Sequence, residues 1–182
     1  MPRNGFGAAA LSAAILALSP GAAAQQAESY GDWMVQGPAG GAITASTATP
    51  AGSLFGLVCD RTKCDAFFNP KIACDDGRDY PVLIGSRTAT FAATMRCTTI
   101  GDFRAFVLPL GGGLADTMAA GGELGIAFPL DAGQFGEARF SLTGAAQAAS
   151  RARERAEQAG GPAAMATAGP VRRLCGARLI LS

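Results

Sequence analysis

The four cysteines between residues 55 and 97 constrain the fold of this chain more than any other feature. Cys59 and Cys64 end and begin two apolar runs, and residues 60–63 between them have the composition of a four-residue hairpin loop. In that register Cys59 lies opposite Cys64, at a separation that a disulfide accepts. We therefore predict a disulfide inside a β-hairpin. The side chains that would share its face are Phe55, Leu57, Ala66 and Phe68.

The second pair, Cys74 and Cys97, brackets a charged turn at 75–79 and a long alternating strand that ends near residue 98. We prefer the pairing Cys74 with Cys97, although four cysteines allow three connectivities. The Cys-x-x-Cys spacing of a redox motif is absent, and so are the paired short spacings of a zinc ribbon. Zinc remains an alternative, but structural disulfides fit the spacing better.

The first residues resemble a secretory signal peptide, which we place at 1–24. Arg3 supplies the positive charge, residues 8–18 are apolar, and small residues at 22–24 precede Gln25. The apolar run is too short to span a bilayer, and no later segment has the composition of a membrane span. We therefore expect a protein of the periplasm or the cell exterior, where disulfides persist.

Residues 25–158 are predicted to form one mainly β domain, a small disulfide-linked sandwich or barrel with a C-terminal α-helix. We expect residues 30–36 to form a single first strand. The helix is predicted at 144–158, where alanine, arginine and glutamate dominate. Because only alanines line its apolar face, we expect it to dock weakly. Residues 159–182 are predicted to be a flexible linker and tail.

Composition excludes several kinds of chemistry. The chain contains no histidine, which removes Ser-His-Asp and Cys-His catalysis as well as histidine metal sites. Lys and Arg number 15 against 14 Asp and Glu, so nothing favours nucleic acid as a partner. We expect no cofactor, no bound metal and a monomeric protein, with an unknown protein or envelope component as partner.

Few residues qualify as a site. Glu123, Asp131 and Glu137 could form a catalytic carboxylate pair, but ordinary surface charge also explains them. An acidic turn holds Asp75, Asp76 and Asp79, and it does not match the spacing of a calcium loop. We predict no catalytic, cofactor-binding or metal-binding residues.

Two single residues remain as candidates. Trp33 is the only tryptophan, and we interpret it as a core anchor or lid, with a surface contact that stacks on a ligand as the alternative. Cys175 makes the cysteine count odd, so it is either a free thiol or a link between two chains. We prefer the free thiol, because pairing it with one of the other four would leave a core cysteine unmatched.

The motif Gly31-Asp-Trp-x-Val35, the paired cysteines, and Phe140-Ser-Leu-x-Gly144 before an alanine-rich helix together resemble the invasion-associated locus B family. These are secreted bacterial proteins with a compact β-rich domain. The resemblance implies a role at the cell envelope and carries no catalytic residues. Gly37 stands near the place where relatives often carry a cysteine, so the disulfide pattern here departs from theirs.

Three functions fit these observations. The first is a non-enzymatic envelope protein that binds a partner through its β-surface or loops. The second is a secreted hydrolase that uses carboxylates, which would need two of them in a deep pocket. The third is a disulfide-linked inhibitor of a secreted protease, which would present an exposed and rigid loop beside a disulfide. We rank them in this order.

Overall fold

The structure is a computed structural model that describes residues 27–37, 41–100, 103–130 and 133–159. The predicted signal peptide at 1–24 lies outside the described residues. The same is true of Asp131, of Cys175 and of all but the first residue of the predicted tail.

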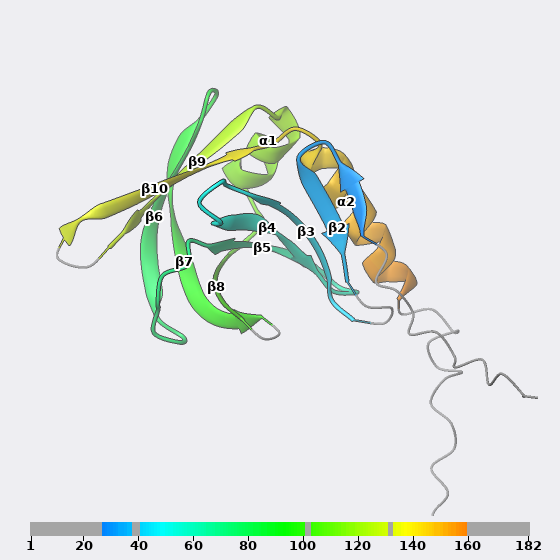
Figure 1. Cartoon of the computed structure of the whole chain (residues 1–182), viewed down its shortest axis with the longest axis horizontal. Coiled ribbons are helices and arrows are strands. Elements are labelled where there is room, and N and C mark those ends of the chain that lie inside the picture. The colour runs from blue at the N-terminus through cyan, green and yellow to red at the C-terminus, as the bar shows by residue number, and fades with distance from the viewer. Residues whose placement is uncertain (1–26, 38–40, 101–102, 131–132, 160–182) are drawn as a thin grey trace, which may run out of the picture.

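In the described part of the chain, ten antiparallel strands form one sheet, and two helices accompany it (Figure 1). The strands are β1 (Glu28–Tyr30), β2 (Trp33–Gln36), β3 (Ile43–Ala48), β4 (Leu54–Cys59), β5 (Cys64–Asn69), β6 (Asp79–Ser86), β7 (Thr90–Ile100), β8 (Phe103–Leu108), β9 (Glu123–Pro129) and β10 (Phe135–Ser141). The helices are α1 (Gly113–Ala120) and α2 (Ala145–Gln158). Across the sheet the order is β1-β2-β3-β4-β5-β8-β7-β6-β9-β10.

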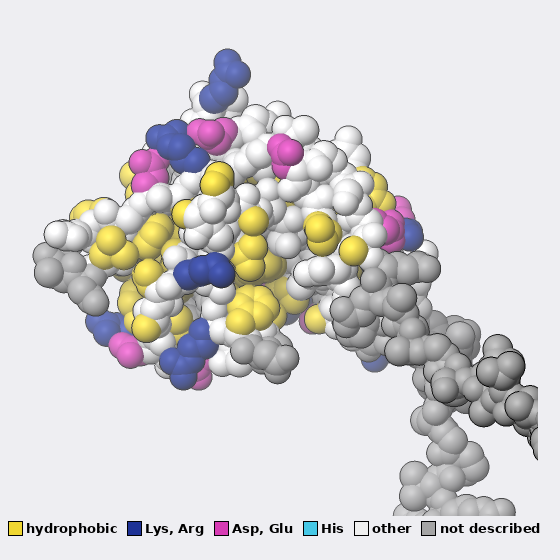
Figure 2. All heavy atoms as spheres, in the orientation of Figure 1, with side chains coloured by type: hydrophobic (Ala, Val, Ile, Leu, Met, Phe, Trp, Pro, Cys, Tyr) yellow, Lys and Arg dark blue, Asp and Glu magenta, His cyan; other side chains and the backbone are white. Residues whose placement is uncertain are grey.

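The sheet curls over so that its β4–β5 part packs against its β9–β10 part. The ring centroids of Phe55 and Phe140 lie 5.6 Å apart, and those of Phe68 and Phe128 lie 5.1 Å apart. Among the described residues no ladder joins the edge strands β1 and β10, so the fold is sandwich-like and not a closed barrel. Figure 2 shows hydrophobic side chains inside the hollow of the curled sheet, with charged side chains mostly around its margin. The predicted fold class is confirmed, and its barrel alternative is wrong.

The cysteine block folds as its spacing predicts. In the β4–β5 ladder Cys59 lies opposite Cys64, and disulfides join Cys59 to Cys64 and Cys74 to Cys97. Cys59 and Cys97 are fully buried. The inward side chains of β4 and β5 are those that the alternation placed beside the first disulfide, because a β-strand repeats every two residues. The first bridge therefore lies at the end of a hairpin, and the second ties β7 to the segment before β6.

The predicted first strand at 30–36 is two strands. Gly31 has φ 55° and forms a two-residue turn with Asp32, which folds β1 back onto β2. A positive φ suits glycine because it has no β-carbon. The prediction of one strand was wrong because Gly31-Asp32 was read as part of a strand and not as a turn.

Helix α2 docks closely onto the sheet, contrary to the weak docking that we predicted. Its inward face consists of Ala145, Ala148, Ala152 and Ala156, each at most 2% exposed, and it packs on β2, β3 and β4. Because these side chains are small, the helix backbone lies near the sheet. The helix therefore packs closely without large apolar side chains. Arg151 adds an ion pair with Glu28 on β1 at 2.7 Å, which ties the helix to the first strand.

Candidate binding surface

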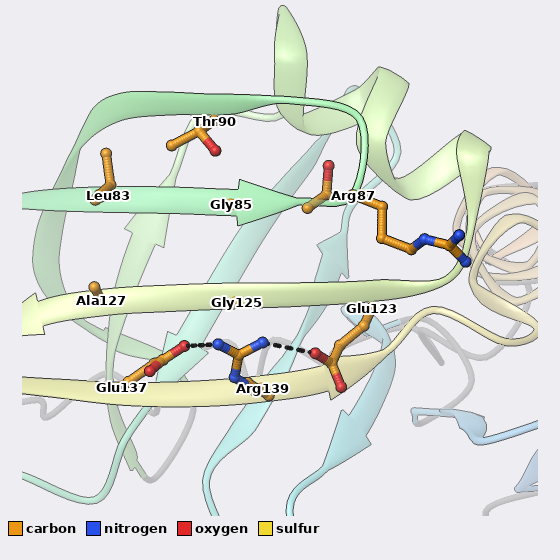
Figure 3. A pocket seen from close by; sticks show the side chains of 10 residues that line it. Leu83, Gly85, Arg87, Thr90, Glu123, Gly125, Ala127, Glu137 and Arg139 are labelled. Atoms are coloured by element: carbon orange, nitrogen blue, oxygen red, sulfur yellow. Dashed lines mark hydrogen bonds and ion pairs between the residues drawn. The ribbon is translucent and has the colours of Figure 1, made fainter.

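Two glycines face each other on the outer side of the sheet. Gly85 of β6 is the direct neighbour of Gly125 of β9, and Gly125 is in turn the neighbour of Arg139 on β10. Because neither glycine carries a side chain, they form the floor of a depression of about 350 Å³ (Figure 3). The residues that line it are Leu83, Gly85, Ser86, Arg87, Thr90, Glu123, Gly125, Ala127, Glu137 and Arg139.

Packing does not require either glycine. A β-carbon built on Gly125 would lie 3.6 Å from its nearest neighbour, Glu137 Oε1, and one on Gly85 would lie 3.7 Å from Thr90 Oγ1. Both distances are ordinary van der Waals contacts. In contrast, a β-carbon on Gly136 would lie 2.5 Å from the ring of Phe128, and one on Gly56 would collide with the Ala45 carbonyl oxygen. Packing would therefore allow a β-carbon at both positions. The depression is open because these two residues are glycines, and not because the fold requires glycine there.

One rim of the depression is a row of three charges. The Arg139 guanidinium lies between two carboxylates, 2.9 Å from Glu123 Oε1 and 2.6 Å from Glu137 Oε1 (Figure 3). These ion pairs raise the pKa of Arg139, chiefly through the hydrogen bond to Glu123 and then through the charge of Glu137. All three side chains are more than half exposed, so the row is a solvated surface network.

The structure thus brings together two of the three carboxylates that we considered for catalysis. A glycosidase-type pair must leave room between its carboxylates for a substrate and, in inverting enzymes, a water. Here the Arg139 side chain occupies that room (Figure 3). Asp131, the third candidate, lies outside the described residues. The arrangement suits the recognition of charge better than proton transfer.

The opposite rim carries residues without a charge partner. Arg87 makes no hydrogen bond or ion pair with any residue that the structure describes, and Figure 3 shows it extending over the Glu123 end of the depression. Leu83 is 49% exposed and lies at the other end, beside Ala127. A guanidinium with no partner in the described part of the chain and an exposed apolar side chain therefore flank a floor of bare backbone.

Trp33 is in the core and is not a surface contact. Its side chain is 1% exposed, it packs edge-on against Phe55, and its indole N–H donates to the Ser141 carbonyl oxygen at 2.9 Å. An apolar ring with one polar edge can be buried only if that edge finds an acceptor. The interpretation of Trp33 as a core anchor is confirmed, and the alternative of a surface contact is wrong.

The acidic turn divides into separate ion pairs. Asp75 pairs with Arg78 at 3.0 Å, and Asp79 pairs with Arg96 at 2.8 Å. Within the described ranges no group of three or more Cys, Asp or Glu residues could hold a metal ion. Cys175, our candidate free thiol, lies outside these ranges.

A second depression, of about 440 Å³, lies where α2 meets β1, and it has a structural explanation. Arg151 in its wall donates to both carboxylate oxygens of Glu28, at 2.7 and 3.1 Å. The pKa of Glu28 is lowered, first by the hydrogen bond from Arg151 and then by the one from Tyr30. These contacts hold the helix on the sheet and leave no group poised for chemistry.

Sequence reasoning missed Gly85, Arg87, Gly125 and Arg139. A signal was present, because Gly85 and Gly125 both occupy outward positions in alternating strands, where a side chain is normally found. What the sequence did not reveal is that β6 and β9 are neighbours, since about forty residues separate the two glycines along the chain.

Comparison with known proteins adds one neighbour. No family model and no curated protein sequence matches the chain. The fold is similar to the crystal structure of invasion associated protein B from Bartonella henselae, with a TM-score of 0.51 and 13% sequence identity, covering 70% of this chain and 95% of that chain. The similarity is one of fold. It confirms, at that level, the resemblance that the short motifs indicated.

Two observations bear on location. Disulfides form and persist in oxidising compartments, so the two bridges are consistent with a place outside the cytoplasm. In the part of the chain that the structure describes, no helix is both long and apolar enough to cross a membrane.

Proposed function

We propose that this protein is an exported, non-enzymatic binding module of the cell envelope, and that its recognition surface is the depression over Gly85 and Gly125. The observation that carries the proposal is that this glycine pair leaves two side-chain positions empty where packing allows them to be filled. Glycine weakens a strand, and it often marks a place where a ligand or another backbone approaches closely. The similarity in fold to an invasion associated protein supports an envelope role.

The lining of the depression indicates the chemistry of the partner. In sheets, an aromatic side chain covers a cross-strand glycine well, because the bare backbone offers a flat surface. Leu83 and Ala127 extend the apolar side of this surface, and Arg87, which has no charge partner among the described residues, offers its guanidinium beside it. We therefore infer a protein partner that places an aromatic side chain on the glycine floor and a carboxylate near Arg87.

Site-specific photo-crosslinking tests this proposal. A photoreactive residue at position 83 lies beside the depression, whereas one at position 34, on the distant strand β2, is a matched control. Leu83 is 49% exposed and Met34 is 44% exposed, so both positions are equally available to a partner. In envelope extracts of the source cell we expect a discrete crosslinked partner from position 83 and not from position 34.

The substitution Arg87→Glu should reduce that crosslink, because it places a negative charge where the partner's carboxylate would lie. Equal crosslinking from positions 83 and 34 would argue against the proposed surface. Hydrolytic activity on a panel of envelope polymers, lost on substitution of Glu123 or Glu137, would favour the carboxylate-dependent hydrolase instead.

One observation favours a second candidate, the protease inhibitor. The loop 60–63 is exposed and closes directly on the Cys59–Cys64 disulfide. Asp60 Oδ1 rigidifies it by accepting hydrogen bonds from the backbone N–H groups of Thr62 and Lys63 at 2.7 and 2.9 Å. Such a loop, with Arg61 exposed within it, has features of an inhibitor of trypsin-like proteases.

Titration against a trypsin-like protease separates the two functions. An inhibitor should block the protease at a one-to-one ratio, and Arg61→Ala should abolish the block. Rapid cleavage of the loop, or no effect on the protease, would remove the inhibitor as a candidate and leave the binding module.

A further inference from the structure

Among the residues that the structure describes, no strand lies beside the outer edge of β10. Along Phe135–Ser141 this strand pairs with β9, and it is the last described strand of the sheet. Figure 1 shows the β9–β10 hairpin projecting away from the rest of the sheet. Only its far end is covered, where the Ser141 carbonyl oxygen accepts the hydrogen bond from Trp33. The edge from Phe135 to Arg139 therefore presents backbone groups to solvent.

The hydrogen bonds at both ends of the hairpin show which groups these are. The N–H of Leu142 donates to Gly122, and the carbonyl oxygen of Gln134 accepts from Leu130. Backbone groups alternate in direction along a strand, so even-numbered residues from 134 to 142 bond to β9. The N–H and C=O groups of Phe135, Glu137 and Arg139 consequently point to the free edge.

The side chains on this edge are complementary to themselves. If two β10 strands lie antiparallel with Ala138 opposite Ala138, then Glu137 of each copy lies opposite Arg139 of the other. In this register, the residues whose backbone groups point to the free edge lie opposite each other, as hydrogen-bonded pairs require. The neighbouring registers of the same parity place Glu137 opposite Glu137, or Arg139 opposite Arg139, and like charges directly opposite are destabilising.

Sterics favour the same register. In an antiparallel ladder the pairs without hydrogen bonds come closest, at about 4.5 Å between α-carbons. The residue at the centre of the register is Ala138, whose small side chain fits that spacing. Phe135, which is 75% exposed at the tip of the hairpin, would lie beside Ser141 of the second copy and lose part of that exposure.

We propose that the partner of this edge is a second copy of the chain, joined by antiparallel pairing of β10 with β10 about Ala138. Charges on an edge strand usually discourage such pairing. Here they alternate in sign about a central alanine, and Arg139 already pairs with Glu137 of its own chain at 2.6 Å. Antiparallel pairing of two copies therefore sets opposite charges, and not like charges, across the edge. This proposal replaces the monomer that we expected from sequence, and it does not depend on the binding surface proposed above.

Hydrogen exchange on the whole protein tests the pairing directly, together with sedimentation equilibrium. We expect the mass to rise toward that of a dimer with concentration, and the amides of Glu137 and Arg139 to become protected in parallel. The amides of Ala138 and Phe140 bond to β9, so they serve as internal controls that are protected at every concentration. A monomeric mass with unprotected amides at positions 137 and 139 throughout would overturn the proposal.

Two variants test the contacts. Arg139→Pro removes an outward N–H that the β9 ladder does not use, along with the ion pairs of Arg139 to Glu123 and Glu137. Glu137→Arg sets like charges opposite each other. Each should weaken dimerisation by at least about tenfold, since every contact occurs twice in a symmetric pair. Ser29→Pro is the control, because it changes the other edge strand, and it should dimerise normally. The amides of residues 137 and 139 could instead become protected only when an extended peptide is added. That result would identify a foreign strand as the partner and overturn the proposal of a second copy.

Discussion

The strand glycines are of two kinds: those that close packing requires, and those that line the surface depression. At Gly56 and Gly136 a neighbouring group occupies the space of a β-carbon, so these glycines belong to the packing of the fold. At Gly85 and Gly125 a β-carbon would meet only ordinary van der Waals contacts, and both positions line the depression. A strand glycine costs about 0.5–1 kcal/mol relative to alanine. Packing gives no reason for this cost at Gly85 and Gly125, whereas a recognition surface would explain it.

Asp60 gives a prediction at the same scale. Hydrogen bonds from the Thr62 side chain, the Thr62 N–H and the Lys63 N–H lower the pKa of Asp60 from 3.8 to about 2. Because the folded pKa lies below the unfolded one, the stabilisation is complete above about pH 4 and is lost as the pH falls toward 2. Asn keeps the acceptor oxygen but does not titrate. We therefore expect the wild type to lose more stability than Asp60→Asn between pH 4 and 2, measured by urea unfolding.

Equal pH dependence in the two proteins would show that the loop does not stabilise the ionised carboxylate of Asp60. A carboxyl titration followed by NMR provides the independent check. It should place the Asp60 midpoint near pH 2, below the ordinary aspartate value of 3.8.

Among the elements, those with a local signal were predictable from sequence, and the pairings between distant strands were not. The β4–β5 hairpin was found with its register because two cysteines, alternating apolar residues and a four-residue loop all specify the same alignment. The neighbours β5–β8 and β6–β9 were not found, because alternation fixes the face of a strand and not its partner. The binding surface depends on the second of these pairings and was missed for that reason.

The docking of α2 was underestimated because alanine was judged by its bulk. Ala148 and Ala152 are fully buried, so the helix contacts the sheet at a distance that only small side chains allow. Ala152→Leu should therefore destabilise the protein by about 1–3 kcal/mol through overpacking, measured by chemical denaturation. Ala146 on the exposed side of the same helix is the matched control, and Ala146→Leu should change stability by no more than about 0.5 kcal/mol. Equal effects of the two substitutions would mean that the helix is not tightly docked.

At the scale of the whole molecule, a single curled sheet packs around one core, and two disulfides lie among its central strands. The bridge Cys59–Cys64 spans 5 residues and Cys74–Cys97 spans 23. In the chain-entropy model these loops contribute about 2 and about 3.4 kcal/mol. For a domain whose total stability is about 5–15 kcal/mol, the second bridge is a large share.

We therefore expect Cys74→Ala with Cys97→Ala to cost about 1 kcal/mol more than Cys59→Ala with Cys64→Ala, by denaturant unfolding of the two double variants. Both pairs contain buried sulfur, so the loss of packing affects each comparison in the same direction. A greater loss from the short-loop pair would show that local strain or packing outweighs loop entropy here.

The central claim is that the depression over Gly85 and Gly125 is held open for a partner and not for the fold. Gly125→Val fills it, and the most direct measurement determines the free energy of unfolding of this variant together with its crosslinking from position 83. We expect the free energy of unfolding to stay equal or rise by up to about 1 kcal/mol, because valine suits a strand and its β-carbon meets only ordinary van der Waals contacts. We expect partner binding to fall at least about tenfold in the same variant. A protein that is destabilised by more than about 1 kcal/mol, or one that still crosslinks as the wild type does, would contradict the claim.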